Sequence, residues 1–420
     1  MDKFQKLDEF NKQYGESFCV KPFTEICNTA KNNLKLCCVA DSLDTVQTSK
    51  TLVDAFYNHP DMNAIRQKIL AGELIKECHT CYYNEKILGS SARTRHSTNL
   101  KNQDPELFDK ILKTGHVEVR TMDVKFGNKC NLGCVMCSHH SSSTIGLELK
   151  NNVVPDELSK IWINGSVHEY DFNSAEFEEL KQYASTIRRF AAKGGEPTLL
   201  PLFKEWIDFL VDNEYSKNIE FSTVTNATVD LSPLIEKLVQ FKEFEIFWSV
   251  DAIGPAFKFL RWPAKFEKVS RNHKRIIKAA LDHDIERFKF GFSVVTHSLN
   301  LDQMVKIAEY ADELEYVDEV YYNIARGNDA MLPGLVSEKT LNQFKHDIDI
   351  YCQGNGKFKN QLKNLLSKVE DRYIEIHSDD ARLSELINNL ILMTDFWKKT
   401  RGLDVNDYVA TFQDTVSQIK

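Results

Sequence analysis

The sequence predicts an α/β fold built around a partial (βα)6 barrel, with a cysteine-rich segment before it and a helical segment after it. From about residue 117 onward, short β-rich segments alternate with longer segments of helical periodicity. This alternation is typical of βα units with a parallel sheet, and right-handed crossovers between six units predict an open barrel. Polar residues also follow each predicted strand, and nine of the ten cysteines lie in the first 137 residues.

The predicted strands are short runs rich in Val, Ile, Phe, Tyr and Thr. They are residues 117–126, 187–193, 218–225, 244–250, 287–296 and 317–325. The helices predicted between the strands carry apolar residues at every third or fourth position. They are residues 174–186, 199–213, 233–241, 266–283 and 301–314.

Composition divides the chain into three expected domains. Residues 1–105 are rich in cysteine and are expected to form a metal-cluster domain. Residues 106–330 contain the strand and helix alternation and are expected to form the barrel. Residues 331–420 read as helices without chemical motifs, and the turn signal at Pro333 and Gly334 marks the boundary before them.

Charge and hydropathy exclude several classes of protein. The net charge is -8 with both signs interspersed, so the sequence lacks the basic stripe that nucleic-acid backbones require. The charged N-terminus and the absence of eighteen consecutive apolar residues argue against a signal peptide and a membrane span. We therefore expect a cytoplasmic protein without a membrane partner, whose cysteines hold metal rather than disulfides.

Three short basic clusters are expected to be solvated faces of helices. They are Arg93 with Arg95 and His96, Arg271 with His273, Lys274 and Arg275, and Lys398 with Lys399 and Arg401.

Three closely spaced cysteines follow the first predicted strand. Three residues separate Cys130 from Cys134, and two separate Cys134 from Cys137. A four-iron, four-sulfur cluster takes four thiolates when fully ligated by protein, so three cysteines would leave one iron open to a substrate or cofactor. The spacing alone also allows a zinc site completed by His139 or His140, or three buried thiols.

Polar residues are expected to converge near these cysteines, because active sites of parallel barrels form at the carboxyl ends of the strands. After the second strand comes a Gly-Gly-Glu-Pro turn, and the third and fourth strands end in further polar groups. These groups are Gly194 to Thr198, Thr225 and Asn226, Ser249 and Asp251, Thr296, His297, Ser298 and Asn300, and Asn323 with Arg326.

The motifs CNLGCVMC, GGEP, TNA and SVD follow successive predicted strands, and in this order the chain resembles the radical SAM superfamily over residues 117–326. The resemblance implies a TIM-like partial barrel and a reduced cluster whose open iron binds the amino and carboxylate groups of S-adenosylmethionine. One electron would then cleave that cofactor to a 5′-deoxyadenosyl radical, which is chemistry that proteins delegate to cofactors.

The resemblance assigns roles to individual residues. Cys130, Cys134 and Cys137 would ligate the cluster. The cofactor-binding residues it implies are Gly194, Gly195, Glu196 and Pro197 for the methionine amino group, Asn226, Ser249 and Asp251 for polar contacts, and Met136. At the Met136 position many family members carry an aromatic residue that packs on adenine, and a polarizable Met can fill that role.

The N-terminal cysteines resemble the auxiliary-cluster half-site of SPASM and twitch domains. The preferred ligands are Cys19, Cys37, Cys78 and Cys81, which would hold a second four-iron, four-sulfur cluster. In those domains glycine usually occupies the position of Asn32, and the domain usually follows the barrel, whereas here it precedes it.

Alternatives remain open within this N-terminal set. Cys38 competes with Cys37, because adjacent residues of a strand point to opposite faces. Cys27 is expected to be packing, and a four-cysteine zinc site would use the same preferred ligands.

Together these features predict an enzyme that cleaves S-adenosylmethionine reductively and abstracts hydrogen from a substrate carbon. The SPASM-like resemblance favours a peptide or protein side chain as substrate. The alternatives are a small molecule or nucleotide, or a non-catalytic iron-sulfur or zinc scaffold, while nucleic acid is disfavoured. A flavodoxin or ferredoxin is the expected electron donor, and no catalytic residue beyond the cluster is assigned.

Overall fold

The computed structural model describes residues 2–29, 32–41, 51–162 and 170–418. Within this part of the chain the polypeptide packs into two units. The first contains residues 1–127, 170–194 and 205–221, and the second contains residues 128–169, 195–204 and 222–420. These units cut across the three expected domains, since the early strands associate with the cysteine-rich segment.

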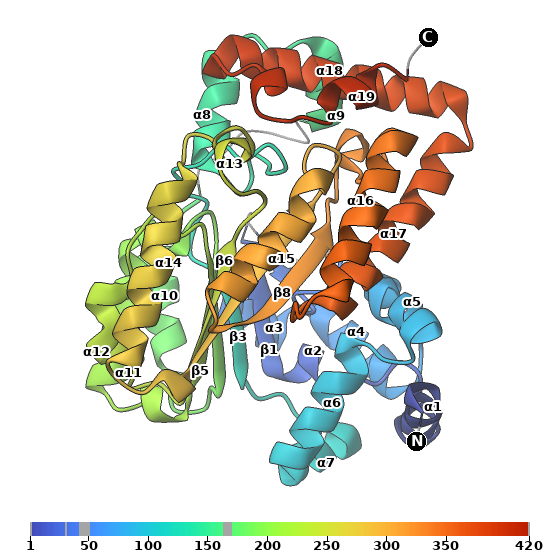
Figure 1. Cartoon of the computed structure of the whole chain (residues 1–420). Helices are drawn as coiled ribbons and strands as arrows, with labels where there is room; N and C mark the ends of the chain where they lie inside the picture. The colour runs from blue at the N-terminus through green and yellow to red at the C-terminus, as the bar shows by residue number, and fades with distance from the viewer. Residues whose placement is uncertain (1, 30–31, 42–50, 163–169, 419–420) are drawn as a thin grey trace. The chain divides into compact units, whose positions relative to one another are not determined.

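The first unit combines a short mixed set of strands with helices (Figure 1). Its strands are β1 (Glu25–Asn28), β2 (Leu34–Lys35), β3 (Thr121–Lys125) and β4 (Arg189–Lys193). β1 pairs antiparallel with β2 and parallel with β3, and β3 pairs parallel with β4. Its helices are α1 (Lys3–Tyr14), α2 (Lys21–Thr24), α3 (Leu52–Asn58), α4 (Pro60–Leu70), α5 (His79–Leu88), α6 (Ala92–Gln103), α7 (Pro105–Thr114) and α10 (Ser174–Lys181).

The second unit continues the βα alternation. β6 (Glu243–Ser249), β7 (Phe288–Thr296) and β8 (Val317–Ile324) pair in parallel in this order. Its helices are α8 (Ser143–Asn151), α9 (Asp156–Trp162), α12 (Ile235–Leu238), α13 (Pro255–Leu260), α14 (Phe266–Leu281), α15 (Met304–Glu313), α16 (Glu338–Gln353), α17 (Lys359–His377), α18 (Asp380–Arg401) and α19 (Phe412–Val416). β5 (Glu220–Thr225) and α11 (Pro201–Asp212) contain residues of both units.

Short 3-10 turns connect many of these elements. They are η1 (Lys76–Cys78), η2 (Pro197–Leu199), η3 (Ser216–Asn218), η4 (Ser232–Leu234), η5 (Ile285–Arg287), η6 (Leu301–Gln303), η7 (Asp329–Met331) and η8 (Val405–Asp407).

Each of the six predicted strands has a counterpart, β3 to β8, with ends shifted by at most four residues. The α/β class with a parallel sheet is therefore confirmed. β1 and β2 were missed in the sequence, because a strand of four residues and one of two are too short to display alternation.

Aromatic packing fills the interior of each unit. In the first unit the Phe190 ring stacks on Phe126 and Phe221, and Trp206 lies against Phe177 and Phe190. In the second unit Trp248 of β6 stacks on Phe290 of β7, which lies two residues from Phe292, the register partner of Trp248, and therefore on the same face of the sheet. None of the helices in the described residues combines the length and apolarity of a membrane span.

Candidate functional site

The cysteine loop between β3 and α8 is held by hydroxyl groups at the start of α8. The Cys130 amide donates to Ser143 Oγ at 3.1 Å, and Thr144 Oγ1 donates to the Cys130 carbonyl at 2.7 Å. Ser142, the N-cap of α8, donates from Oγ to the Leu132 carbonyl at 2.6 Å. Ser, as an N-cap, starts the helix, and here the same serine also fixes the loop.

A second segment, residues 260–262 at the end of α13, borders the same loop. The Gly133 amide donates to the Trp262 carbonyl at 2.7 Å, and the Val135 amide donates to the Leu260 carbonyl at 3.0 Å. A further turn joins the Cys137 amide to the Cys134 carbonyl at 3.0 Å. The spacing of the three cysteines is therefore shaped by main-chain hydrogen bonds.

The Gly-Gly-Glu-Pro turn lies against the main chain that enters the cysteine loop. A Cβ on Gly195 would stand 2.5 Å from the carbonyl oxygens of both Asn128 and Lys129, so only glycine allows this approach. The Glu196 amide donates to the Lys129 carbonyl at 2.9 Å, and Pro197 begins η2. Gly194 belongs to the first unit, where its φ of +143° also favours glycine.

Glu196 ties this turn to the end of β5. Its side chain accepts hydrogen bonds from Thr198 Oγ1 at 2.6 Å, Thr225 Oγ1 at 2.7 Å and the Asn226 amide at 2.6 Å. Burial raises the pKa of this carboxyl, while the donated hydrogen bonds oppose the rise. The side chain thus has a structural role in addition to the backbone role expected for the turn.

Asn226 closes the connection back to the cysteine loop. Its Nδ2 donates to Asn131 Oδ1 at 3.0 Å and lies 4.0 Å from Cys130 Sγ, and its Oδ1 accepts from the Thr228 amide at 2.9 Å. The CNLGC, GEP and TNA motifs therefore meet in one hydrogen-bonded network within the second unit.

The remaining predicted cofactor residues differ in their burial and in their partners. Ser249 and Met136 are half-buried. Asp251 is fully buried, and its carboxylate accepts from Arg261 Nη1 and from the Val295 amide, the latter at 2.7 Å. Because both oxygens already have partners, Asp251 is placed to orient Arg261.

Arg261 belongs to this site, although the sequence did not predict a role for it. Its guanidinium is buried and paired with Asp251, and its Nε has no hydrogen-bond partner among the described residues. Burial opposes its positive charge, but the nearby Cys134 thiol and Asp251 raise its pKa. An Arg between Leu260 and Trp262 carries no spacing signal, so only the fold reveals its position beside the cysteines.

The three thiols interact electrostatically with one another. Burial, followed by the neighbouring Cys134, raises the pKa of Cys130 to about 12, and burial followed by Cys134 and Cys130 raises the pKa of Cys137. Burial also raises the pKa of Cys134, which Arg261 and Arg401 oppose. Such thiols are stable as neutral groups until a cation replaces the proton.

No three His, Cys, Asp or Glu side chains among the described residues converge on a point where one metal ion would sit. An iron-sulfur cubane has a different requirement, because each cysteine binds a separate iron at a separate corner. The thiols of Cys130, Cys134 and Cys137 lie on one short loop, as that requirement demands.

In the first unit, the N-terminal cysteines gather around one cavity. Cys19, Cys37, Cys78 and Cys81 line it together with Cys38, while Cys27 lies buried in β1 and lines no part of it. Burial and then Cys37 raise the pKa of Cys19, with smaller effects from Cys78 and Cys81. The structure therefore brings the four preferred ligands together.

Cys37 and Cys38 were expected to lie in a strand, where only one of them could face a cluster, but the structure has no strand at these two residues. β2 ends at Lys35, and the following residues form bends, so both cysteines line the cavity. Asn32, at the usual glycine position, has a φ of +61°, and Asn tolerates this left-handed conformation better than most residues.

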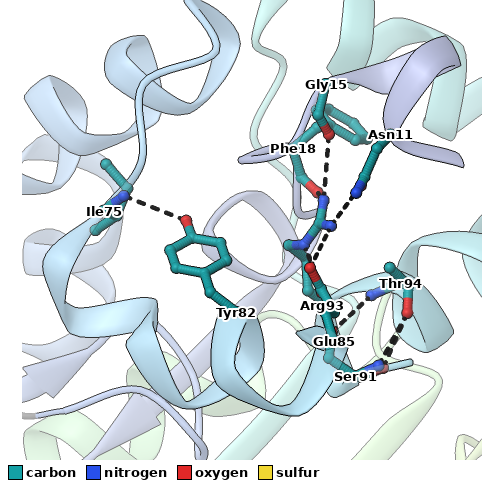
Figure 2. A network of polar contacts seen from close by, with 9 residues as sticks. All are labelled: Asn11, Gly15, Phe18, Ile75, Tyr82, Glu85, Ser91, Arg93 and Thr94. Carbon is teal, nitrogen blue, oxygen red and sulfur yellow. Dashed lines mark hydrogen bonds and ion pairs between the residues drawn. The ribbon is translucent and has the colours of Figure 1, made fainter. Parts of the chain in front are cut away.

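Arg93 shows that the expected solvation of its basic cluster was wrong. Its guanidinium is buried and donates to Glu85 Oε2 at 2.8 Å, to Asn11 Oδ1 at 2.7 Å and to the carbonyls of Gly15 and Phe18 (Figure 2). It also lines the cysteine cavity. Backbone carbonyls of the α1–α2 connection need donors when they are buried, which explains a cation inside this unit.

Comparison with known proteins finds similarity to one family in the central part of the chain. Residues 124–311 match the model of the Radical SAM superfamily. An uncharacterized protein, MJ0907 of Methanocaldococcus jannaschii, is 23% identical over 260 residues, which are 61% of this chain and 78% of that protein.

Solved structures show more distant likeness. SuiB of Streptococcus suis bound to S-adenosylmethionine is 13% identical, with a TM-score of 0.41, over 67% of this chain and 59% of that chain. Coproporphyrinogen III oxidase (HemN) of Escherichia coli, a radical SAM enzyme, is 13% identical with a TM-score of 0.35, over 57% and 53%. The chain thus spans less than two thirds of either structure, and neither likeness defines its substrate.

Proposed function

We propose that this protein is a radical SAM enzyme, with its radical SAM domain at residues 124–311, and that it abstracts hydrogen from a carbon of a peptide or protein side chain. The family implies a four-iron, four-sulfur cluster and S-adenosylmethionine. When bound and reduced, for example by a flavodoxin or ferredoxin, the cluster supplies one electron that cleaves the cofactor to methionine and a 5′-deoxyadenosyl radical.

The observation that carries this proposal is the network joining the cysteine loop to two other motifs. Glu196 contacts Lys129 through its main chain and Asn226 through its side chain, and Asn226 contacts Asn131. A metal scaffold would need the cysteines but not the glycine at position 195 or the amide at position 226. A cofactor bound beside the loop would explain both the glycine at position 195 and the amide at position 226.

We propose roles for the residues around the loop. Cys130, Cys134 and Cys137 would hold three irons, and the Gly194–Pro197 turn would present backbone groups to the amino group of S-adenosylmethionine. Arg261 would meet its carboxylate, because the buried guanidinium has an Nε without a partner in the described residues and pairs best with an anion. Ser249 and Met136 would contact the nucleoside, with Asp251 holding Arg261.

The strands β3 to β8 would form the partial (βα)6 barrel around this site. The support is the order of six strands with intervening helices, since such units close in one hand. The helical segment 331–420 would then follow the barrel as an extension.

We further propose that Cys19, Cys37, Cys78 and Cys81 hold an auxiliary cluster of the SPASM or twitch kind. The support is their shared cavity and the left-handed Asn32 in the place of glycine. This likeness is also what favours a peptide substrate over a small molecule or nucleotide. The ten free cysteines favour work in the reducing cytoplasm.

The function is tested by anaerobic reconstitution, reduction with dithionite and measurement of 5′-deoxyadenosine formed from S-adenosylmethionine. We expect product from the wild type and loss of product, by at least about 100-fold, in Cys134→Ala, because removing a ligand removes the electron source. Cys352→Ala is the matched control, since this thiol lies on α16 and belongs to neither set of predicted ligands. No product despite a reduced cluster would contradict the proposal.

The same reconstituted protein tests the auxiliary cluster and the substrate class. About eight iron atoms per chain are expected for two clusters, and about four with zinc present would contradict the second one. If the substrate is a peptide, adding a short peptide encoded beside this gene should increase 5′-deoxyadenosine formation. The mass of that peptide should also change, because it is modified. An increase with nucleosides instead would favour the small-molecule alternative.

A further inference from the structure

Arg401 joins the C-terminal helix to the cysteine loop. It lies in the last turn of α18, and its Nη1 donates to the Gly133 carbonyl at 2.7 Å, between Cys130 and Cys134. Gly402, with a φ of +66°, ends the helix immediately afterwards. The helix end therefore directs this side chain at the loop.

The guanidinium is anchored on its other edge by Glu148 of α8. Arg401 Nε lies 2.7 Å from Glu148 Oε1, and Nη2 lies 2.6 Å from Oε2, a two-pronged pair. The two side chains are only 1% and 6% exposed. Thr400 Oγ1 donates to the same carboxylate at 2.8 Å. Figure 1 shows α8 and α18 side by side in the second unit.

Two tryptophan rings enclose the guanidinium. Its carbon lies 5.1 Å from the centre of the Trp262 ring and 5.3 Å from that of Trp397, distances at which a cation is attracted to a ring face. Trp262 belongs to the segment that accepts a hydrogen bond from Gly133. Arg401 therefore contacts the loop directly and also packs on the segment that borders it.

Arg401 also contributes charge at the loop. Its guanidinium is hydrogen-bonded to the carbonyl of Gly133, the residue directly before Cys134, so the positive charge lies against the main chain that carries this thiol. The Cys134 side chain is buried, so solvent screens this charge little. A site with three thiolates gains from positive charge held nearby.

We propose that Arg401 is a positioning residue of the cluster site, which orders the cysteine loop through Gly133 and raises the reduction potential of the cluster by its charge. The C-terminal helical segment is then a working part of the radical SAM site and not only a cover. This inference rests on the proposed ligation of a cluster by Cys130, Cys134 and Cys137.

The test compares Arg401→Met, Arg401→Lys and Glu148→Gln in the full-length protein after anaerobic reconstitution. Cluster retention is measured as the rate of iron loss to a chelator. The midpoint potential is measured from the EPR signal that changes when S-adenosylmethionine is added, which isolates the cluster with the open iron. Lys399→Met is the matched control, because it removes one charge from an exposed position in the same helical turn.

Arg401→Met should lose iron about 10- to 100-fold faster than the wild type, as is usual when a residue supporting metal ligands is removed. Its midpoint potential should shift to more negative values. Arg401→Lys should keep the potential near that of the wild type, because it retains the charge. It should still lose iron faster, because a lysine lacks the planar guanidinium that binds a carboxylate and the loop at the same time. Glu148→Gln should shift the potential in the positive direction.

Equal iron loss and equal potential in Arg401→Met and Lys399→Met would overturn the inference while leaving the proposed function intact. Faster iron loss without any shift in Arg401→Met and Glu148→Gln would overturn the charge role. A wild type that binds no iron at the triad would instead overturn the proposed function, and this inference with it. If Arg401→Met does not fold, iron loss from Arg401→Lys tests the positioning role, and the midpoint potential of Glu148→Gln tests the charge role.

Discussion

Gly195 is the residue at which the site depends most sharply on backbone shape. The two carbonyl oxygens that a Cβ would meet at 2.5 Å belong to residues just before Cys130. Neither oxygen can move without moving the cysteine loop, which is tied on both sides by hydrogen bonds.

Gly195→Ala is therefore expected to lower the free energy of unfolding by about 1–3 kcal/mol, as overpacking usually does, and to weaken S-adenosylmethionine binding. Urea unfolding and equilibrium binding measure the two effects. Gly354→Ala is the control, because its Cβ would meet only one carbonyl, at 3.5 Å, with a φ of -79°. Equal behaviour of the two variants would show that the turn has room to adjust.

In each basic cluster one side chain is buried while its neighbours are exposed or only partly buried. Arg93, His273 and Arg401 are buried, whereas Arg95, Lys274 and Lys399 are exposed. The expectation that all three clusters are solvated was wrong at one residue in each. Sequence spacing does not reveal this, because the partners lie far along the chain, as Glu148 does from Arg401.

At the scale of elements, α6 is held to the N-terminal helices by Arg93. The side chain reaches Asn11 of α1, Glu85 of α5 and the Gly15 and Phe18 carbonyls in one cluster of contacts (Figure 2). Ser91 and Thr94 form a capping box that starts α6 at the position from which Arg93 points inward.

Arg93→Met should lower the free energy of unfolding by about 3–5 kcal/mol, because it leaves Glu85 buried without its cation. It should also disturb the nearby cysteine cavity and reduce iron bound there. Arg95→Met, on the exposed face of the same helix, should stay within about 0.5 kcal/mol of the wild type. Chemical unfolding and iron analysis test this, and a small effect of Arg93→Met would contradict the role given to the network.

At the scale of the whole molecule, buried histidines predict sensitivity to acid. Burial lowers the pKa of His273 and of His297 to about 3. His273 stacks on Trp248, and its Nε2 has no hydrogen-bond partner in the described residues. The imidazole is therefore neutral in the folded protein across the neutral and mildly acidic range.

The direction of the pH effect on stability depends on how many protons the folded and unfolded states bind. An unfolded histidine takes up a proton near pH 6.5, whereas the folded one does not until about pH 3, so the unfolded state binds more protons between these values. Stability should fall as pH decreases through this window, by about 1–2 kcal/mol per histidine between pH 6.5 and pH 5.

His273→Phe should flatten this dependence, because the ring can still stack on Trp248 without taking up a proton. Urea unfolding of the cluster-free protein at pH 7.5, 6.5 and 5 measures it, with His346→Gln as an exposed control. An unchanged slope in His273→Phe would show that other groups cause the acid sensitivity.

Local patterns in the chain were sufficient to predict the strands, most helices and the cysteine loop. Strands such as β7 and helices such as α14 are encoded by neighbouring residues, and so is the spacing from Cys130 to Cys137. The gathering of Cys19, Cys37, Cys78 and Cys81 around one cavity was also expected, from the resemblance of the N-terminal segment to a known half-site.

Folding in three dimensions decided which polar residues became partners. The pairing of Arg401 with Glu148, the burial of Arg261 beside Asp251, and the bend that turned both Cys37 and Cys38 to one cavity depend on segments that meet only after packing. Burial and electrostatics act through distance in space, and distance along the chain does not specify it. For that reason the sequence could indicate which cysteines belong together, whereas it could not indicate the buried cations Arg261 and Arg401.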